Sequence, residues 1–60
     1  MTEANSLAGL SISQLDALRL FHCVEGRAAQ SAGDKDEAYR HAMIVRRVVG
    51  EMRVRQMVAA

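Results

Sequence analysis

The segment Ser31-Ala32-Gly33 interrupts two long stretches of helical sequence, and it most strongly limits what this chain can fold into. The chain has 60 residues and contains no proline, the residue that would break either stretch. Gly33 suits the left-handed conformation that follows many helices, and Asp34 suits the cap of a second helix. A tight turn between two long helices produces an antiparallel pair, so we expect an all-α helical hairpin.

The beginning of the first helix is marked by three signals that agree at Ser11. Gln14 follows Ser11 at the capping-box spacing, in which each side chain bonds the other residue's backbone N–H. Leu10 and Leu15 occupy the positions of a hydrophobic staple on either side of the cap. We therefore expect the helix to begin here.

These signals divide the chain into four segments. We expect a flexible or loosely docked arm over residues 1–10, which show no sustained periodicity. A helix follows over about 11–30, a turn at 31–33 and a second helix over about 34–58. The second helix is longer than the first, so its last eight residues should project unless Leu7 and Leu10 fold back over them.

A turn centred near Gly33 also predicts which residues of the two helices lie level with each other. The expected pairs are Val24 with His41, Leu20 with Val45, and Ser13 with Met52. The inner face of the second helix is predicted from a spacing of alternating four and three residues, typical of a helical-bundle seam. It comprises Ala38, Ala42, Val45, Val49, Met52, Gln56 and Ala59, flanked by His41 and Val48.

The first helix has more apolar surface than one partner helix can cover. One stripe comprises Ala17, Leu20, Phe21, Val24 and Ala28, and a second comprises Leu15, Leu18, His22 and Ala29. A single seam takes only about two residues in seven. Half of the residues are hydrophobic, so we expect two hairpins to dimerise into a four-helix bundle. A hetero-assembly and a monomer are the alternatives.

The predicted contacts between subunits combine residues of both helices. They are Leu15, Leu18, Phe21, His22, Val45, Val49 and Met52. A second patch on the other side of the second helix is a candidate face for a partner protein or a nucleic acid. It comprises Tyr39, Arg40, Met43, Arg46, Arg47, Arg53 and Met57.

Catalytic, cofactor and metal sites are not predicted. The chain has no glycine-rich phosphate loop and no nucleophile with a base at a workable spacing. His22 and Cys23 are adjacent, so on a helix they point about 100° apart and cannot both face one ion. His41 is expected to approach Glu25 across the hairpin as a hydrogen-bonded interface residue, and such a pair would make dimer stability sensitive to pH.

The charge distribution supports an alternative role in binding RNA or DNA. Residues 40–60 contain five Arg and one Glu, a net charge of +4, although the whole chain carries only +1. Such a segment can contact phosphates. The arginines are nevertheless spread around the helix, and capping charges and solubility also account for them.

Length and hydropathy indicate where the protein functions. No run of about 18 apolar residues predicts a membrane span, and residues 1–10 lack the features of a signal peptide. The single cysteine, Cys23, suits a reducing compartment. We therefore expect a cytoplasmic protein that has no contact with membranes.

Two resemblances are architectural. The hairpin with its short turn resembles the Rop-type dimers that regulate RNA, without a shared motif. Residues 29–42, with Ala-Gly-Asp at the turn followed by Glu37, Ala38 and Ala42, are similar to the turn of a tetratricopeptide repeat. Neither resemblance assigns a functional residue. The sequence predicts a small interaction protein that acts through protein contacts as a homo-oligomer, with an RNA- or DNA-binding bundle as the alternative.

Overall fold

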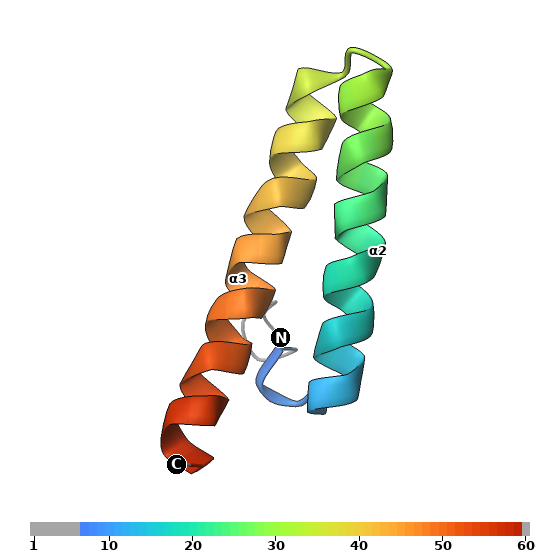
Figure 1. Ribbon diagram of the computed structural model, residues 1–60. Helices are drawn as coiled ribbons and strands as arrows, with labels where there is room; N and C mark the ends of the chain where they lie inside the picture. The colour runs from blue at the N-terminus through green and yellow to red at the C-terminus, as the bar shows by residue number, and fades with distance from the viewer. Residues whose placement is uncertain (1–6, 60) are drawn as a thin grey trace.

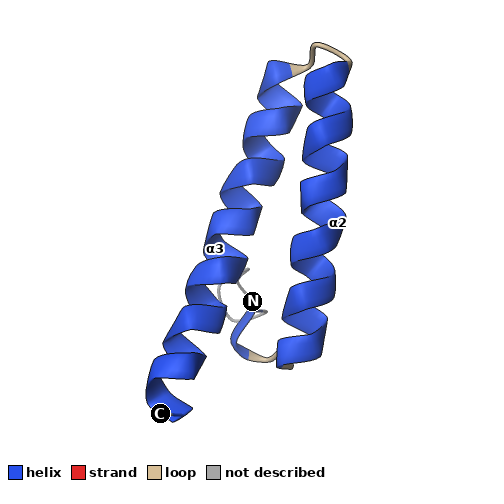
Figure 2. Cartoon of the chain, in the orientation of Figure 1, coloured by secondary structure: helices blue, strands red, loops and turns tan. Residues whose placement is uncertain are grey.

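Two long helices of the described chain pack side by side in opposite directions (Figure 1). This computed structural model describes residues 7–59. Helix α2 spans Ile12–Ser31 and helix α3 spans Lys35–Ala59, and a short turn joins them (Figure 2). The all-α hairpin is confirmed, and the helix ends lie within one residue of the predicted positions.

The start of α2 is stabilised by the predicted capping box. The Gln14 backbone N–H donates to the Ser11 hydroxyl over 3.1 Å, and the Ser11 N–H donates to the Gln14 side-chain oxygen over 2.9 Å. Both donors belong to the helix start, where backbone N–H groups have no partner within the helix. The first helix therefore begins where its sequence predicts.

The turn between the helices is closed by a Schellman motif. The Gly33 N–H donates to the Gln30 carbonyl and the Asp34 N–H to the Ala29 carbonyl, over 3.1 and 2.9 Å. Gly33 has φ of 82°, a left-handed conformation that disfavours side chains. The Asp34 carboxylate then accepts the Glu37 N–H over 3.1 Å and so caps α3.

The relative position of the two helices agrees with the predicted register. His41 has His22 and Gly26 as neighbours, two residues on either side of Val24, which was expected level with it. Val24 itself points outward and is 62% exposed. The helices are therefore aligned along their axes as predicted, but different side chains face each other.

The predicted inner face of α3 is wrong, because the helix is rotated about its axis relative to the predicted seam. Val48, expected on the flank, is fully buried with Leu15 at the centre of the hairpin. Ala42 and Gln56, expected in the seam, are exposed. The apolar arc of α3 is wider than one seam, and a rotated helix buries a larger apolar side chain at the centre. The side chain of Ala59, also in the predicted seam, lies outside the described residues.

Arg55 fastens the N-terminal segment to the far end of α3. Its guanidinium donates to the backbone carbonyls of Leu7, Ala8 and Leu10, and it pairs with Glu51 over 2.9 Å. Residues 7–10 are therefore docked on α3, which is the alternative to a projecting helix end that the sequence left open. Residues 1–6 of the predicted arm lie outside the described part of the chain.

The hairpin is a single layer of helices, and this limits what it can bury. The molecule measures 40 × 26 × 15 Å, and its smallest dimension is close to the diameter of one helix with its side chains, about 10–12 Å. Each helix consequently covers only one side of its neighbour. No helix in residues 7–59 has the length and apolar character needed to cross a lipid bilayer.

Two helical glycines should respond differently to substitution. Gly50→Ala should raise the free energy of unfolding by about 0.5–1 kcal/mol, because alanine favours the helix and nothing lies within 4 Å of the added Cβ. Gly26→Ala should raise the free energy of unfolding by less, or lower it, because the added Cβ would lie 3.2 Å from the His41 Cβ. Urea denaturation measures both. Equal stabilisation by the two substitutions would contradict the close approach of the helices at Gly26.

Candidate interaction surfaces

An apolar groove runs between the helices on one face of the hairpin. It consists of two open hollows, of about 420 and 260 Å³, with His22 and Gly26 also lining the larger one. We call this surface the interhelical groove. Its α2 side comprises Ile12, Arg19, Cys23, Arg27 and Gln30, and its α3 side comprises Ala42, Val45, Val49, Met52, Arg53 and Gln56.

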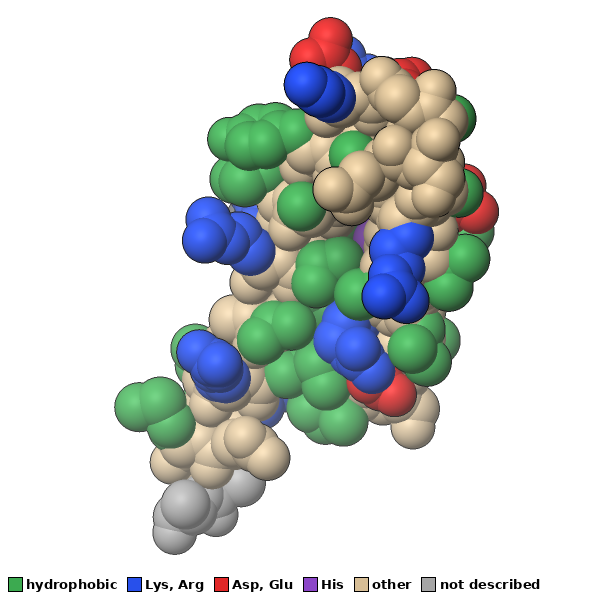
Figure 3. All heavy atoms as spheres, turned by 45° about the horizontal axis from the view of Figure 1, so that its top comes forward, with side chains coloured by type: hydrophobic (Ala, Val, Ile, Leu, Met, Phe, Trp, Pro, Cys, Tyr) green, Lys and Arg blue, Asp and Glu red, His purple; other side chains and the backbone are tan. Residues whose placement is uncertain are grey.

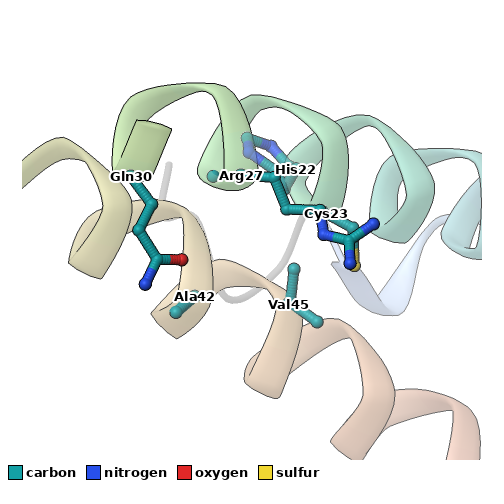
Figure 4. A pocket seen from close by; sticks show the side chains of 7 residues that line it. His22, Cys23, Arg27, Gln30, Ala42 and Val45 are labelled. Carbon is teal, nitrogen blue, oxygen red and sulfur yellow. The ribbon is translucent and has the colours of Figure 1, made fainter. Parts of the chain in front are cut away.

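Arginines stand on both sides of this groove. Figure 3 shows Lys and Arg side chains flanking a strip of apolar side chains between the two helices. Figure 4 shows the larger hollow, into which α2 contributes Cys23, Arg27 and Gln30, while α3 contributes Ala42 and Val45. The groove therefore has an apolar floor and a cationic rim.

Only one of the rim arginines is neutralised by a neighbouring acid. Arg19 forms a 2.8 Å ion pair with Asp16, whose hydrogen bond and charge raise the pKa of Arg19. Arg27 and Arg53 form no ion pair within residues 7–59. The rim consequently carries two cations that no acid of the described chain balances.

A second surface covers the outside of α2. We call it the outer stripe, and it comprises Ala17, Leu20, Phe21, Val24 and Ala28. Leu20, Phe21 and Val24 are 50, 56 and 62% exposed. The outer stripe contains no charged residue. It is thus an apolar surface left uncovered by α3. The excess of apolar residues predicted one uncovered stripe on this helix, but most of the predicted subunit contacts of the helix belong to the other stripe.

The residues predicted to join two subunits do not form one surface. Leu15 fills the core of the single hairpin and has no exposed surface. Phe21 belongs to the outer stripe, and His22 faces α3. Val45, Val49 and Met52 line the interhelical groove. Leu18 is half-buried and lies between the core and the Phe21 side of α2 by helical spacing.

The predicted partner face on α3 is exposed. Arg40 forms a 3.3 Å ion pair with Glu37 and is the one member of this set with an acidic partner in the described chain. The apolar members are exposed to different degrees, from 37% for Met43 to 77% for Met57. All seven residues are exposed on α3, namely Tyr39, Arg40, Met43, Arg46, Arg47, Arg53 and Met57.

The two histidines of the chain meet between the helices, a contact that the sequence analysis missed. The Nδ1 atoms of His22 and His41 lie 2.8 Å apart, so one ring donates a hydrogen bond to the other. The expected partner of His41, Glu25, is exposed, and Glu37 instead lies 3.8 Å from the His41 Nε2. The predicted contact between Glu25 and His41 is wrong because Glu25 lies on a side of α2 that points away from α3. The predicted register already placed His22 near the level of His41, and this was the signal for the observed contact.

The histidine pair is not part of a larger cluster of metal-binding side chains in the described chain. Within residues 7–59, no group of three or more His, Cys, Asp or Glu side chains is placed to hold a metal ion. Cys23 is a half-buried free thiol that lines the larger hollow. The hydrogen bond between the two imidazoles joins α2 to α3.

Comparison with known proteins gives no relative for this hairpin. No family model matches the chain, and neither the characterised proteins nor the solved structures contain a significant match. The resemblances to Rop-type dimers and to the tetratricopeptide turn therefore remain resemblances of architecture. The function must be inferred from the surfaces that the hairpin presents.

Proposed function

We propose that this chain is a small non-enzymatic interaction protein that works as an adaptor, assembly factor or regulator through protein contacts. The observation that carries the proposal is the outer stripe, where Leu20, Phe21 and Val24 are at least half exposed. Only Leu15 and Val48 are fully buried within the described chain. A hairpin with so small a core and so large an apolar surface gains stability when another surface covers it.

A second copy of the chain suits the outer stripe. In a twofold dimer the same patch contacts itself, so a patch with charges of one sign repels its copy, whereas an uncharged apolar patch does not. The outer stripe has no charged residue, and this supports its use as a self-interface. Two hairpins joined along α2 would make a dimer of four helices. The dimer contact proposed from the structure is thus centred on Phe21 and Val24.

Binding of RNA or DNA through α3 is a second candidate function. The observation in its favour is that Arg46, Arg47 and Arg53 are exposed and form no ion pair within residues 7–59. Such arginines are available to phosphates. Their spread around α3 favours the first proposal.

The dimer proposal predicts that a charge on the outer stripe separates the subunits. Val24→Glu should convert a species of about twice 6.6 kDa into a monomer, because a carboxylate would be buried without a partner. The control is Val54→Glu, a substitution of the same residue type at a similarly exposed site on α3, 55% against 62%. Sedimentation equilibrium measures the masses. A folded wild-type monomer at micromolar concentration would refute the dimer.

The nucleic-acid candidate predicts salt-dependent binding. If it holds, the chain retains a labelled RNA or DNA oligonucleotide at low salt and loses it steeply as salt rises. The double substitution Arg46→Ala with Arg47→Ala should then abolish retention. Under the interaction-protein proposal we expect no retention, and electrophoretic mobility shifts of the wild type distinguish the two functions.

A further inference from the structure

The interhelical groove differs from the outer stripe in charge, and this difference indicates a different occupant. Every charged residue that lines the groove is an arginine: Arg19, Arg27 and Arg53. Asp16 neutralises the first of them, and the other two have no acidic partner within residues 7–59. A molecule that fills the groove must therefore bury apolar surface and place negative charge on both sides.

The shape of the groove suits a helix. Its floor is made of small and medium side chains, chiefly Ala42, Val45 and Val49. The centres of the two hollows are about nine residues apart along α3, which at the helical rise is about 13 Å. A helix laid between two others reaches both hollows with apolar side chains spaced over about two and a half turns.

We propose that the interhelical groove binds an amphipathic helix of a partner protein, one whose apolar stripe is flanked by carboxylates. This inference rests on the proposed function, because it names the partner that an interaction protein of this shape would take. The apolar stripe packs on Val45, Val49 and Met52, and the flanking carboxylates pair with Arg27 on one side and Arg53 on the other. Charge complementarity of this kind mainly determines which partner binds.

Two other occupants fit the groove less well. A second copy docked groove to groove would bring the same arginines towards each other, and Asp16 is already paired with Arg19. A nucleic acid would supply negative charge but would leave the apolar floor without a partner. The one Phe and the one Tyr of the chain, Phe21 and Tyr39, do not line the groove, so neither can stack a base there.

Synthetic helices provide a direct test with the full chain. The first probe is an 18-residue fluorescent peptide with a leucine stripe flanked by Glu, and the second has Lys at every Glu position. A third peptide has the composition of the first in an order without a stripe, and the fourth probe is a single-stranded RNA. Fluorescence anisotropy should show the first probe binding at least about tenfold more tightly than each of the others.

Matched variants locate the binding on the protein. Arg53→Glu should weaken binding of the Glu-flanked helix about tenfold, whereas Arg47→Glu should leave it within about twofold. Both residues are exposed arginines of α3 without an ion pair in residues 7–59, and only Arg53 lines the groove. Ala42→Glu, at an exposed position of the floor, should also abolish binding while circular dichroism shows unchanged helicity.

Four results would overturn the inference. The first is equal binding of the Glu- and Lys-flanked helices, and the second is tighter binding of RNA than of the Glu-flanked helix. The third is an equal effect of Arg47→Glu and Arg53→Glu on binding of that helix. The fourth is dissociation of a wild-type dimer by Ala42→Glu. The last result would mean that a second copy occupies the groove. The separated Val24→Glu hairpin should still bind the Glu-flanked helix. If the wild type is a monomer that binds the Glu-flanked helix, the dimer is refuted and the proposed use of the groove is supported. If the wild type is a dimer that does not bind this helix, the dimer is supported and the proposed use of the groove is refuted.

Discussion

The tight turn at Gly33 fixes how the two helices are aligned along their axes. Its left-handed backbone reverses the chain within three residues, and the hydrogen bonds around it hold the connection between the end of α2 and the cap of α3 in one conformation. Two helices joined this closely must lie antiparallel with one alignment along their axes. The meeting of His22 with His41, and of Gly26 with the same His41, follows from that alignment.

Two helices in one layer enclose very little volume. Each covers one side of the other, and all remaining apolar side chains lie at the surface, whatever their size. In this chain the remaining surface is divided by charge: the outer stripe is uncharged, whereas Arg27 and Arg53 border the interhelical groove. The division offers the hairpin two different contacts, one with itself and one with an acidic partner.

The caps, the turn and the alignment of the helices could be predicted from the sequence, because each depends on residues that are close together in the chain. Ser11 with Gln14 and Gly33 with Asp34 are local signals of this kind. The rotation of α3 could not be predicted in the same way. Apolar residues occupy more than one seam of that helix, so the choice of Val48 over Ala42 for the interior depends on how side chains fit across the pair.

The candidate surfaces were predictable to different degrees, because they depend to different degrees on the rotation of the helices. The excess of apolar residues on one helix predicted that one stripe would stay uncovered, but it did not identify the outer stripe, since Leu15 and His22 of the other stripe were expected at the subunit contact. The groove requires the rotation of both helices, so Arg19 and Arg27 were not recognised as its rim. A signal was nonetheless present, since Ile12, Arg19 and Cys23 recur on one side of α2 at helical spacing.

The contacts of Arg55 bear on the order in which the hairpin assembles. The histidine contact joins residues 19 apart in the chain, whereas Arg55 reaches carbonyls 45 to 48 residues away. Longer loops cost more entropy to close, and the cost falls when contacts nearer the turn have already shortened the remaining loop. We infer that contacts between the helices form first near the turn and then progressively towards the open end. The hydrogen bonds of Arg55 form last and join the two ends of the described chain.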